Sequence, residues 1–241
     1  MSGGIDPQVD DRLLRAANQP NTGSSVSGER LAHELDPLLE SLGLGNERGL
    51  AEALGGYLDL LQRWNSTYNL TAVRDRAGMR TQHLADCLAI LAPLRRQAVK
   101  GRLLDVGSGG GLPGVVIAAA QPTIDVTCVD TVGKKAAFVR QVAGTLNLPN
   151  LHAVHSRVEA MKAPPFDIIT SRAFATLELF TRLTESHLAV GGVWMAMKGQ
   201  MPDEEIAALP TAIEVFHVEQ LHVPGLDAQR CLVCMRRQAA A

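Results

Sequence analysis

Two different rhythms of hydrophobic and polar residues divide the chain. Between residues 29 and 92, apolar side chains recur every three or four positions, which is the period of one face of an α-helix. Three such stripes follow one another, at residues 31–42, 50–64 and 79–91, and Pro93 is expected to end the last helix. We therefore predict a helical part at residues 29–95.

From residue 102 onward, short apolar runs alternate with longer helical patterns. Strands that alternate with helices predict βαβ units in a parallel sheet. The last two runs, IEVFHVEQLHV and RCLVCMR, have no full helix between them, which indicates a hairpin with one antiparallel strand. The sequence thus predicts an α/β fold at residues 96–241, a mostly parallel, doubly wound sheet of seven strands with an antiparallel C-terminal hairpin.

Composition and the chain ends narrow the class of protein. Residues 1–28 have too little apolar surface to offset the entropy of ordering, so we expect a mobile tail. Four cysteines in 241 residues make no disulfide framework. No apolar run approaches the ~18 residues of a membrane span, and the N-terminal sequence lacks the pattern of a secretory signal. We expect a cytoplasmic protein that does not contact a membrane.

The segment LLDVGSGGGLPG at residues 103–114 carries the clearest chemical signal. A strand ends at Asp105 and Val106, glycines follow, and a helix is expected to begin near Leu112 with Pro113 in its first turn. Glycines let a ligand approach the backbone closely, and the start of a helix offers free N–H groups. We predict that this loop binds an anionic or carboxylate-bearing ligand at the carboxyl edge of the sheet.

Two kinds of ligand fit this loop. The dinucleotide fingerprint G-x-G-x-x-G is matched by Gly109, Gly111 and Gly114. The stretch that begins at Asp105 resembles the D-x-G-x-G-x-G of class I S-adenosylmethionine enzymes. A carboxylate at Asp105 suits the ammonium group of methionine and would repel a pyrophosphate, which favours S-adenosylmethionine. Asp130, at the end of the next strand, fits a partner of ribose hydroxyls in either case, and a glycine turn without a ligand is the third interpretation.

Five motifs along the chain resemble a single protein family. They are WNSTYNLTAVRD, DVGSGGGLPG, LNLPNLHAVHSRVE, SRAFATL and MKGQMPDEEI. In this order they cover about residues 34–237, and together they are similar to the RsmG (GidB) family, the bacterial 16S rRNA guanine-N7 methyltransferases. The departures are a longer N-terminal segment and GKK at residues 133–135, where the family more often has GKR.

The resemblance implies a Rossmann-like class I methyltransferase fold, S-adenosylmethionine as the methyl donor, and 16S rRNA as the substrate, within a 30S particle. The family's donor-contacting positions carry over to Gly107, Leu112, Val158, Glu159 and Arg172. Asp130 fits the ribose position by its motif, and Asp105, Gly109 and Gly111 complete the glycine loop. From the residues alone, Glu159 also fits an acid in the first turn of a helix, and Arg172 a surface ion pair.

The segment after the fourth predicted strand, TSRAF, bears on the methyl acceptor. It has neither the N/D-P-P-Y element of enzymes that methylate exocyclic amines nor a cysteine nucleophile. Guanine N7 has a free lone pair and loses no proton, so its methylation needs alignment rather than a general base. We therefore expect no acid–base pair, and the candidates to position the base are Asn69, Arg172 and Phe174, of which Phe174 fits the core equally well.

The cysteines and histidines favour ordinary structural roles. Cys231 and Cys234 point to opposite faces of an alternating strand and cannot chelate one metal ion. The histidines have no zinc spacing, so we expect no metal. His83, three residues before Asp86 on a predicted helix, fits either a local pair or a substrate contact.

The net charge of −2 conceals an uneven distribution of charges. Residues 1–62 contain 4 Lys and Arg against 10 Asp and Glu, whereas residues 63–241 contain 19 against 15. This modestly basic part suits weak, salt-sensitive contacts with RNA phosphates. The candidate contacts, which solvated surface charge explains equally well, are Arg74, Arg76, Arg80, Lys134, Lys135 and Arg140. A small-molecule methyltransferase and a non-enzymatic binder with a vestigial fold are the alternative functions, and we expect a monomer.

Overall fold

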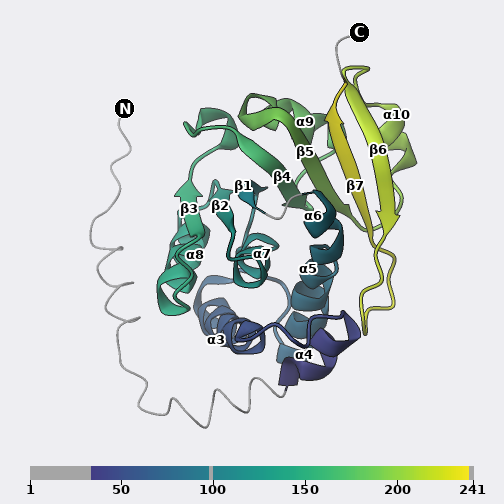
Figure 1. Ribbon diagram of the computed structural model, residues 1–241. Coiled ribbons are helices and arrows are strands. Elements are labelled where there is room, and N and C mark those ends of the chain that lie inside the picture. The colour runs from purple at the N-terminus through teal and green to yellow at the C-terminus, as the bar shows by residue number, and fades with distance from the viewer. Residues whose placement is uncertain (1–33, 98–99, 239–241) are drawn as a thin grey trace, which may run out of the picture.

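The computed structural model describes residues 34–97 and 100–238. The centre of the molecule is a seven-stranded sheet with the strand order β3-β2-β1-β4-β5-β7-β6 (Figure 1). The strands are β1 (Gly101–Val106), β2 (Ile124–Asp130), β3 (Leu151–His155), β4 (Phe166–Arg172), β5 (Leu188–Lys198), β6 (Ile213–Gln220) and β7 (Cys231–Arg237). The predicted tail at residues 1–28 lies outside the described residues.

The strand pairing confirms the predicted doubly wound sheet and its C-terminal hairpin. Strands β1 to β5 pair in parallel, and β7 runs antiparallel to both of its neighbours, β5 and β6. The hairpin pattern did not reveal that the last strand of the chain lies between β5 and β6. The strand order reverses between β1 and β4, and in open α/β sheets ligands bind at such a switch point, beyond the carboxyl ends of the strands.

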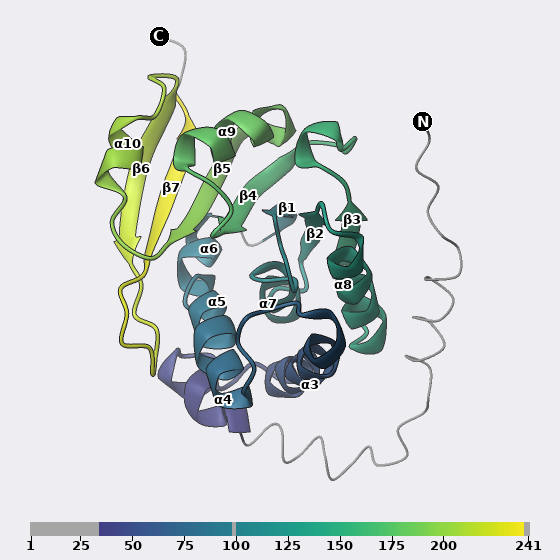
Figure 2. The same cartoon turned by 180° about the vertical axis from the view of Figure 1, so that it is seen from behind.

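Helices cover both faces of the sheet (Figures 1 and 2). One apolar core joins α7, α8 and the N-terminal helices to the sheet, and a second core joins α9 to the opposite face. The α-helices are α3 (Leu50–Tyr68), α4 (Arg76–Met79), α5 (Asp86–Leu88), α6 (Leu91–Gln97), α7 (Gly114–Ala120), α8 (Gly133–Thr145), α9 (Leu177–Thr184) and α10 (Asp203–Ala207). Residues 34–41 are also helical. A π-helical segment, η1 (Arg80–Ala85), and the 3₁₀ turns η2 (Val158–Ala160) and η3 (Glu185–His187) complete the set.

Successive side chains of the central strands alternate between these two cores. In β1, Leu103 belongs to the first core and Leu104 to the second. In β7, Cys234 faces the first core and Val233 the second, as a period of two residues requires. All four cysteines are buried and unpaired, in agreement with the packing role expected for Cys231 and Cys234.

The N-terminal helices pack onto the sheet domain through an aromatic cluster. The ring of Phe138 in α8 lies 6.2 Å from that of Tyr57 and 5.4 Å from that of Trp64, both in α3. The indole N–H of Trp64 also donates to Gln141 Oε1 over 2.6 Å. One hydrophobic core therefore contains residues from both sides of the predicted boundary between residues 95 and 96. The division of the chain into two parts at that boundary stays a prediction.

Two helix boundaries differ from the sequence-based expectations. Pro93 does not end a helix, because it is the third residue of α6, where the absent N–H costs no intrahelical bond. The helix after the glycine loop begins at Gly114 rather than near Leu112, with Pro113 as its N-cap. Within the described residues, no helix is long and apolar enough to cross a membrane.

The aromatic cluster generates a test of the interface between α3 and α8. Because the Phe138 side chain is fully buried, Phe138→Ala should lower the free energy of unfolding by about 3–5 kcal/mol, through lost burial and a residual cavity. Urea unfolding followed by circular dichroism measures this loss. Val190→Ala is the control, because that side chain is fully exposed and its loss should change stability by about 0.5 kcal/mol or less. Equal losses for the two variants would contradict the packing described here.

Candidate functional site

The glycine loop lies between β1 and α7, at the carboxyl edge of the sheet. Gly107 has a φ of 68°, a left-handed conformation that glycine adopts without strain. A Cβ atom there would lie 2.6 Å from Cδ2 of Phe174, so the glycine also lets the phenyl ring approach the backbone. The sequence therefore needs glycine at this position for conformation and for space.

Two carboxylates accept hydrogen bonds from the backbone of this loop and of the residues next to it. Asp105 is fully buried, and its Oδ2 accepts the N–H of Gly114 over 2.8 Å. Asp130 accepts the N–H of Gly109 through Oδ2 over 2.9 Å and that of Val132 through Oδ1 over 2.8 Å. Both acids that the sequence singled out thus fix the loop.

Asp105 lies behind the glycine loop, away from the cavities in front of it. It is absent from the lining of both cavities at this edge, and its Oδ1 has no hydrogen-bond partner within the described residues. Burial raises the pKa of the Asp105 carboxyl to about 7. Asp105 thus supports the loop through Gly114, and its direct contact with a ligand ammonium stays a prediction.

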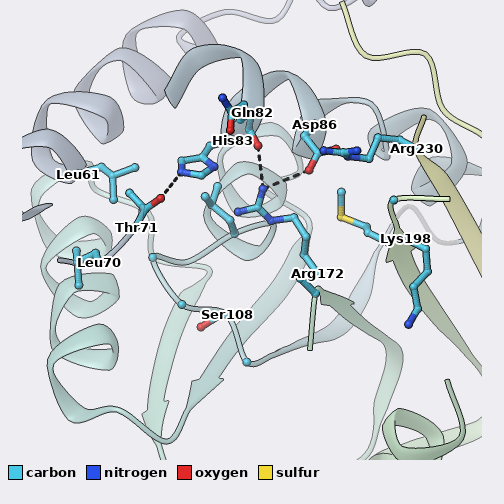
Figure 3. A pocket seen from close by; sticks show the side chains of 17 residues that line it. Leu61, Leu70, Thr71, Gln82, His83, Asp86, Ser108, Arg172, Lys198 and Arg230 are labelled. Carbon is cyan, nitrogen blue, oxygen red and sulfur yellow. Dashed lines mark hydrogen bonds and ion pairs between the residues drawn. The ribbon is translucent and has the colours of Figure 1, made fainter. Parts of the chain in front are cut away.

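Two cavities lie in front of the loop and share Gly107 and Ala173. The smaller, of about 310 Å³, we call the β2–β3 cavity, because Asp130, Val158 and Glu159 line it together with Phe174. The larger, of about 500 Å³, we call the N-terminal cavity, because residues of the N-terminal helices form one wall (Figure 3). Its lining includes Leu61, Leu70, Thr71, Gln82, His83, Asp86, Gly109, Leu112, Arg172, Lys198 and Arg230.

The cavities thus separate the predicted site residues into two groups. Asp130, Val158 and Glu159 meet in the β2–β3 cavity, whereas Gly109, Leu112 and Arg172 meet in the N-terminal cavity, with Gly107 between them. Gly111 lines neither cavity. Hydrogen bonds to its own backbone and to Arg157 lower the pKa of Glu159, so it is an anion at the rim.

Phe174 and Asn69, two of the candidates to position the base, do not line the N-terminal cavity. Phe174 lines the β2–β3 cavity rather than the N-terminal cavity, and its ring packs 6.4 Å from that of Phe180. Asn69 is the C-cap of α3, and its Oδ1 accepts from Arg74 over 2.8 Å. The loop after α3 instead reaches the N-terminal cavity through Leu70 and Thr71, and a contact of Asn69 or Phe174 with a base stays a prediction.

A buried carboxylate between two arginines forms the polar wall of the N-terminal cavity. Asp86 accepts from Arg172 Nη1 over 3.2 Å and from Arg230 Nε over 2.9 Å, and Arg172 also donates to the carbonyl of Gln82 over 3.0 Å (Figure 3). Two guanidinium groups against one carboxylate leave a net positive charge beside the cavity. No sequence signal marked Arg230, since the fold alone brings the residue before β7 next to the start of α5.

His83 binds the loop after α3 instead of pairing with Asp86. Its Nε2 lies 2.7 Å from Thr71 Oγ1 (Figure 3), and burial together with the nearby Arg172 lowers the pKa of the imidazole. Asn65, which sequence reasoning did not select, accepts the N–H of Thr71 and donates to the carbonyl of Val73. Both side chains therefore fix the wall that Thr71 contributes.

The structure bears on metal binding and on one of the predicted phosphate contacts. Within the part of the chain that the structure describes, no group of three His, Cys, Asp or Glu residues suits a metal ion. Arg76 forms ion pairs with Glu34 and Asp59, so it is engaged within the protein. The other predicted phosphate contacts remain predictions.

Comparison with known proteins identifies relatives along most of the chain. A family model described as "rRNA small subunit methyltransferase G" matches residues 50–234. The chain belongs to this family, GidB. A family protein named "Ribosomal RNA small subunit methyltransferase G" from Methylibium petroleiphilum is 56% identical over 219 residues, which cover 90% of this chain and 99% of that protein. A protein of the same name from Leptothrix cholodnii is 60% identical over 193 residues, or 79% of this chain and 88% of the relative.

A solved structure agrees with the expected fold. The glycopeptide N-methyltransferase MtfA in complex with sinefungin superposes with a TM-score of 0.55 at 12% identity, over 65% of this chain and 88% of that protein. At this identity the likeness shows the fold alone. The Rossmann-like class I methyltransferase fold implied by the GidB-like motifs is confirmed.

The buried Asp105 carboxyl predicts a pH effect on stability. A carboxyl whose pKa is about 7 when folded and about 4 when unfolded binds more protons in the native state between these values. Its contribution to stability is therefore complete below about pH 4 and is lost as the pH rises to about 7. Asp105→Asn keeps an oxygen for the Gly114 N–H and removes this titration.

The measurement is the free energy of unfolding in urea at pH values between about 4 and 8. We expect the variant to gain stability relative to the wild type as the pH rises. A difference between the two proteins that does not vary with pH would show that Asp105 does not titrate abnormally.

Proposed function

We propose that this protein transfers a methyl group from S-adenosylmethionine to N7 of a guanine in 16S rRNA of the small ribosomal subunit. Membership of the GidB family and the two cavities that meet at Gly107 support the proposal. We further propose that it acts as a monomer in the cytoplasm, on rRNA within a 30S particle.

The β2–β3 cavity suits the adenosine part of the cofactor. Each oxygen of Asp130 accepts one backbone N–H and has a further lone pair for a ribose hydroxyl. The apolar side chain of Val158 offers a surface for the adenine ring, and Glu159 supplies an acceptor at the rim. Gly107, against which the Phe174 ring packs, lies where the two cavities join.

The N-terminal cavity suits the methionine part and the guanine. Arg172 is fixed by Asp86 and Gln82, so its guanidinium is preorganised for a carboxylate. His83 and Thr71 provide a polar wall opposite the glycine loop, and burial, which lowers the pKa of His83, favours the uncharged imidazole. These groups can hold the two reactants in line, which is the main catalytic requirement here.

The chemistry explains why the site needs no general base. The cofactor supplies an electrophilic methyl group on a sulfonium. The N7 lone pair would form the new N–C bond as the S–C bond breaks, and the electron pair of the S–C bond would stay on sulfur. The positive charge passes to the purine and no proton is released, so alignment and exclusion of water are the tasks of the protein.

Methyl transfer to small subunits tests the proposal. Subunits from a strain that lacks this gene should accept labelled methyl groups from S-adenosylmethionine, and chemical cleavage at 7-methylguanine should map the label to one position in 16S rRNA. Subunits from the parent strain are the control, because their site is already methylated. Turnover on a small metabolite without label in rRNA would instead support the alternative, a small-molecule methyltransferase.

Arg172 provides a test of the cofactor site. Arg172→Ala should weaken binding of S-adenosylhomocysteine about 10-fold or more, because a charge-assisted hydrogen bond is lost. Isothermal titration calorimetry measures the dissociation constant. Arg182→Ala, at an exposed position of α9, is the matched control and should bind like the wild type. Equal affinities of the two variants would remove Arg172 from the site.

A further inference from the structure

The loop at residues 173–176, which we call the partition loop, separates the two cavities. Ala173 lines both of them, and Phe174 lines the β2–β3 cavity. The ring of Phe174 lies against Gly107, where a Cβ atom would be only 2.6 Å from its Cδ2 atom. The position of this loop therefore sets the width of the passage between the cavities.

The partition loop begins in an unfavourable backbone conformation, which other contacts must stabilise. Ala173 has a φ of 54°, in the left-handed region, which costs a residue with a Cβ atom about 1–2 kcal/mol. Such a conformation persists when the surrounding contacts compensate for it. Upstream, Arg172 is fixed by Asp86 and Gln82.

Downstream, one ion pair fixes the other end of the loop. Lys198, the last residue of β5, donates from Nζ to the carbonyl of Ala175 over 2.8 Å and to Glu205 Oε2 over 2.7 Å. The same Glu205 oxygen accepts the N–H of Leu177, the first residue of α9, over 2.7 Å. Lys198 and Glu205 thus connect β5, α10 and both sides of Thr176.

The surroundings of the Lys198–Glu205 pair show that its charge faces the partition loop. The side chain of Lys198 is 16% exposed and that of Glu205 is 30% exposed, so solvent screens the pair only in part. Figure 3 shows the Lys198 side chain extending away from the Asp86–Arg172 pair. Lys198 therefore belongs to the wall of the N-terminal cavity but directs its charge to the partition loop.

We propose that Glu205, acting through Lys198, is a positioning residue for methyl transfer that holds the partition loop where the cofactor can extend from one cavity into the other. The proposal rests on the function proposed above. Glu205 itself lines neither cavity, so its effect on the cofactor is indirect. Without it, Ala173 and Phe174 lose their fixed position over Gly107.

Three single variants and a control test this role. Glu205→Ala removes both bonds to the carboxylate, and Glu205→Gln keeps an acceptor for the Leu177 N–H but loses the charge that faces Lys198. Lys198→Met removes the bond to Ala175. Glu204→Ala is the matched control, because Glu204 is exposed on the same short helix and lines neither cavity.

The readouts are the dissociation constant of S-adenosylhomocysteine, the KM values for cofactor and for 30S subunits, and the thermal midpoint. We expect Glu205→Ala to raise the cofactor constants about 10-fold and leave the KM for subunits unchanged, with Glu205→Gln intermediate. The double variant Glu205→Ala, Lys198→Met should be no worse than the worse single variant, since both act on one loop. Glu204→Ala should behave like the wild type.

Two results would overturn the inference in different ways. If Glu205→Ala and Glu205→Gln bind the cofactor as Glu204→Ala does and only their thermal midpoints fall, Glu205 serves stability alone. If the wild type itself does not bind S-adenosylhomocysteine, the proposed function fails and the inference fails with it. Glu205→Gln, which preserves a hydrogen bond to α9, decides the question if Glu205→Ala does not fold.

Discussion

The backbone of the glycine loop is the feature on which the rest of the site depends. Three buried side chains bind it from different directions: Asp105 at Gly114, Asp130 at Gly109, and Tyr57, whose hydroxyl donates to the carbonyl of Gly110 over 2.8 Å. Leaving any of these buried groups without its partner would cost on the order of 1–3 kcal/mol. The loop is therefore fixed before any ligand binds, and both cavities are built against it.

One cavity of the site is formed by the common parallel sheet, and the other is formed in part by elements added to that sheet. The parallel sheet supplies the β2–β3 cavity through the ends of β1, β2 and β3, as in other α/β folds that bind at a switch point. The N-terminal helices and the loop before β7 supply the outer wall of the other cavity, including His83, Asp86 and Arg230. Elements added around a common fold therefore form the side that faces the acceptor in the proposed function.

Sequence reasoning succeeded where a local pattern has a local structural cause. The glycines after β1 and the acid that ends β2 have fixed spacing along the chain, so the sequence was enough to place the loop and to bring Asp130 to its side. Prediction from the sequence succeeded less where the role of a residue depends on a contact with a distant part of the chain. The burial of Asp105 is invisible in the sequence. Helical spacing suggested Asp86 as one possible partner of His83, whereas Arg172 at the end of β4 and Arg230 in the loop before β7 bind Asp86.

By itself, the sequence determined the order of helices and strands, the parallel sheet with its reversed C-terminal strand, and the residues of the glycine loop. These depend on the period of apolar residues and on the backbone freedom of glycine, which act over a few positions. Only the tertiary structure decided that β7 lies between β5 and β6, that Arg230 meets Asp86, and that Lys198 and Glu205 hold the partition loop. These contacts join residues that are far apart in the chain or separated by a turn, and burial and pairing across the folded core, rather than any spacing in the sequence, bring them together.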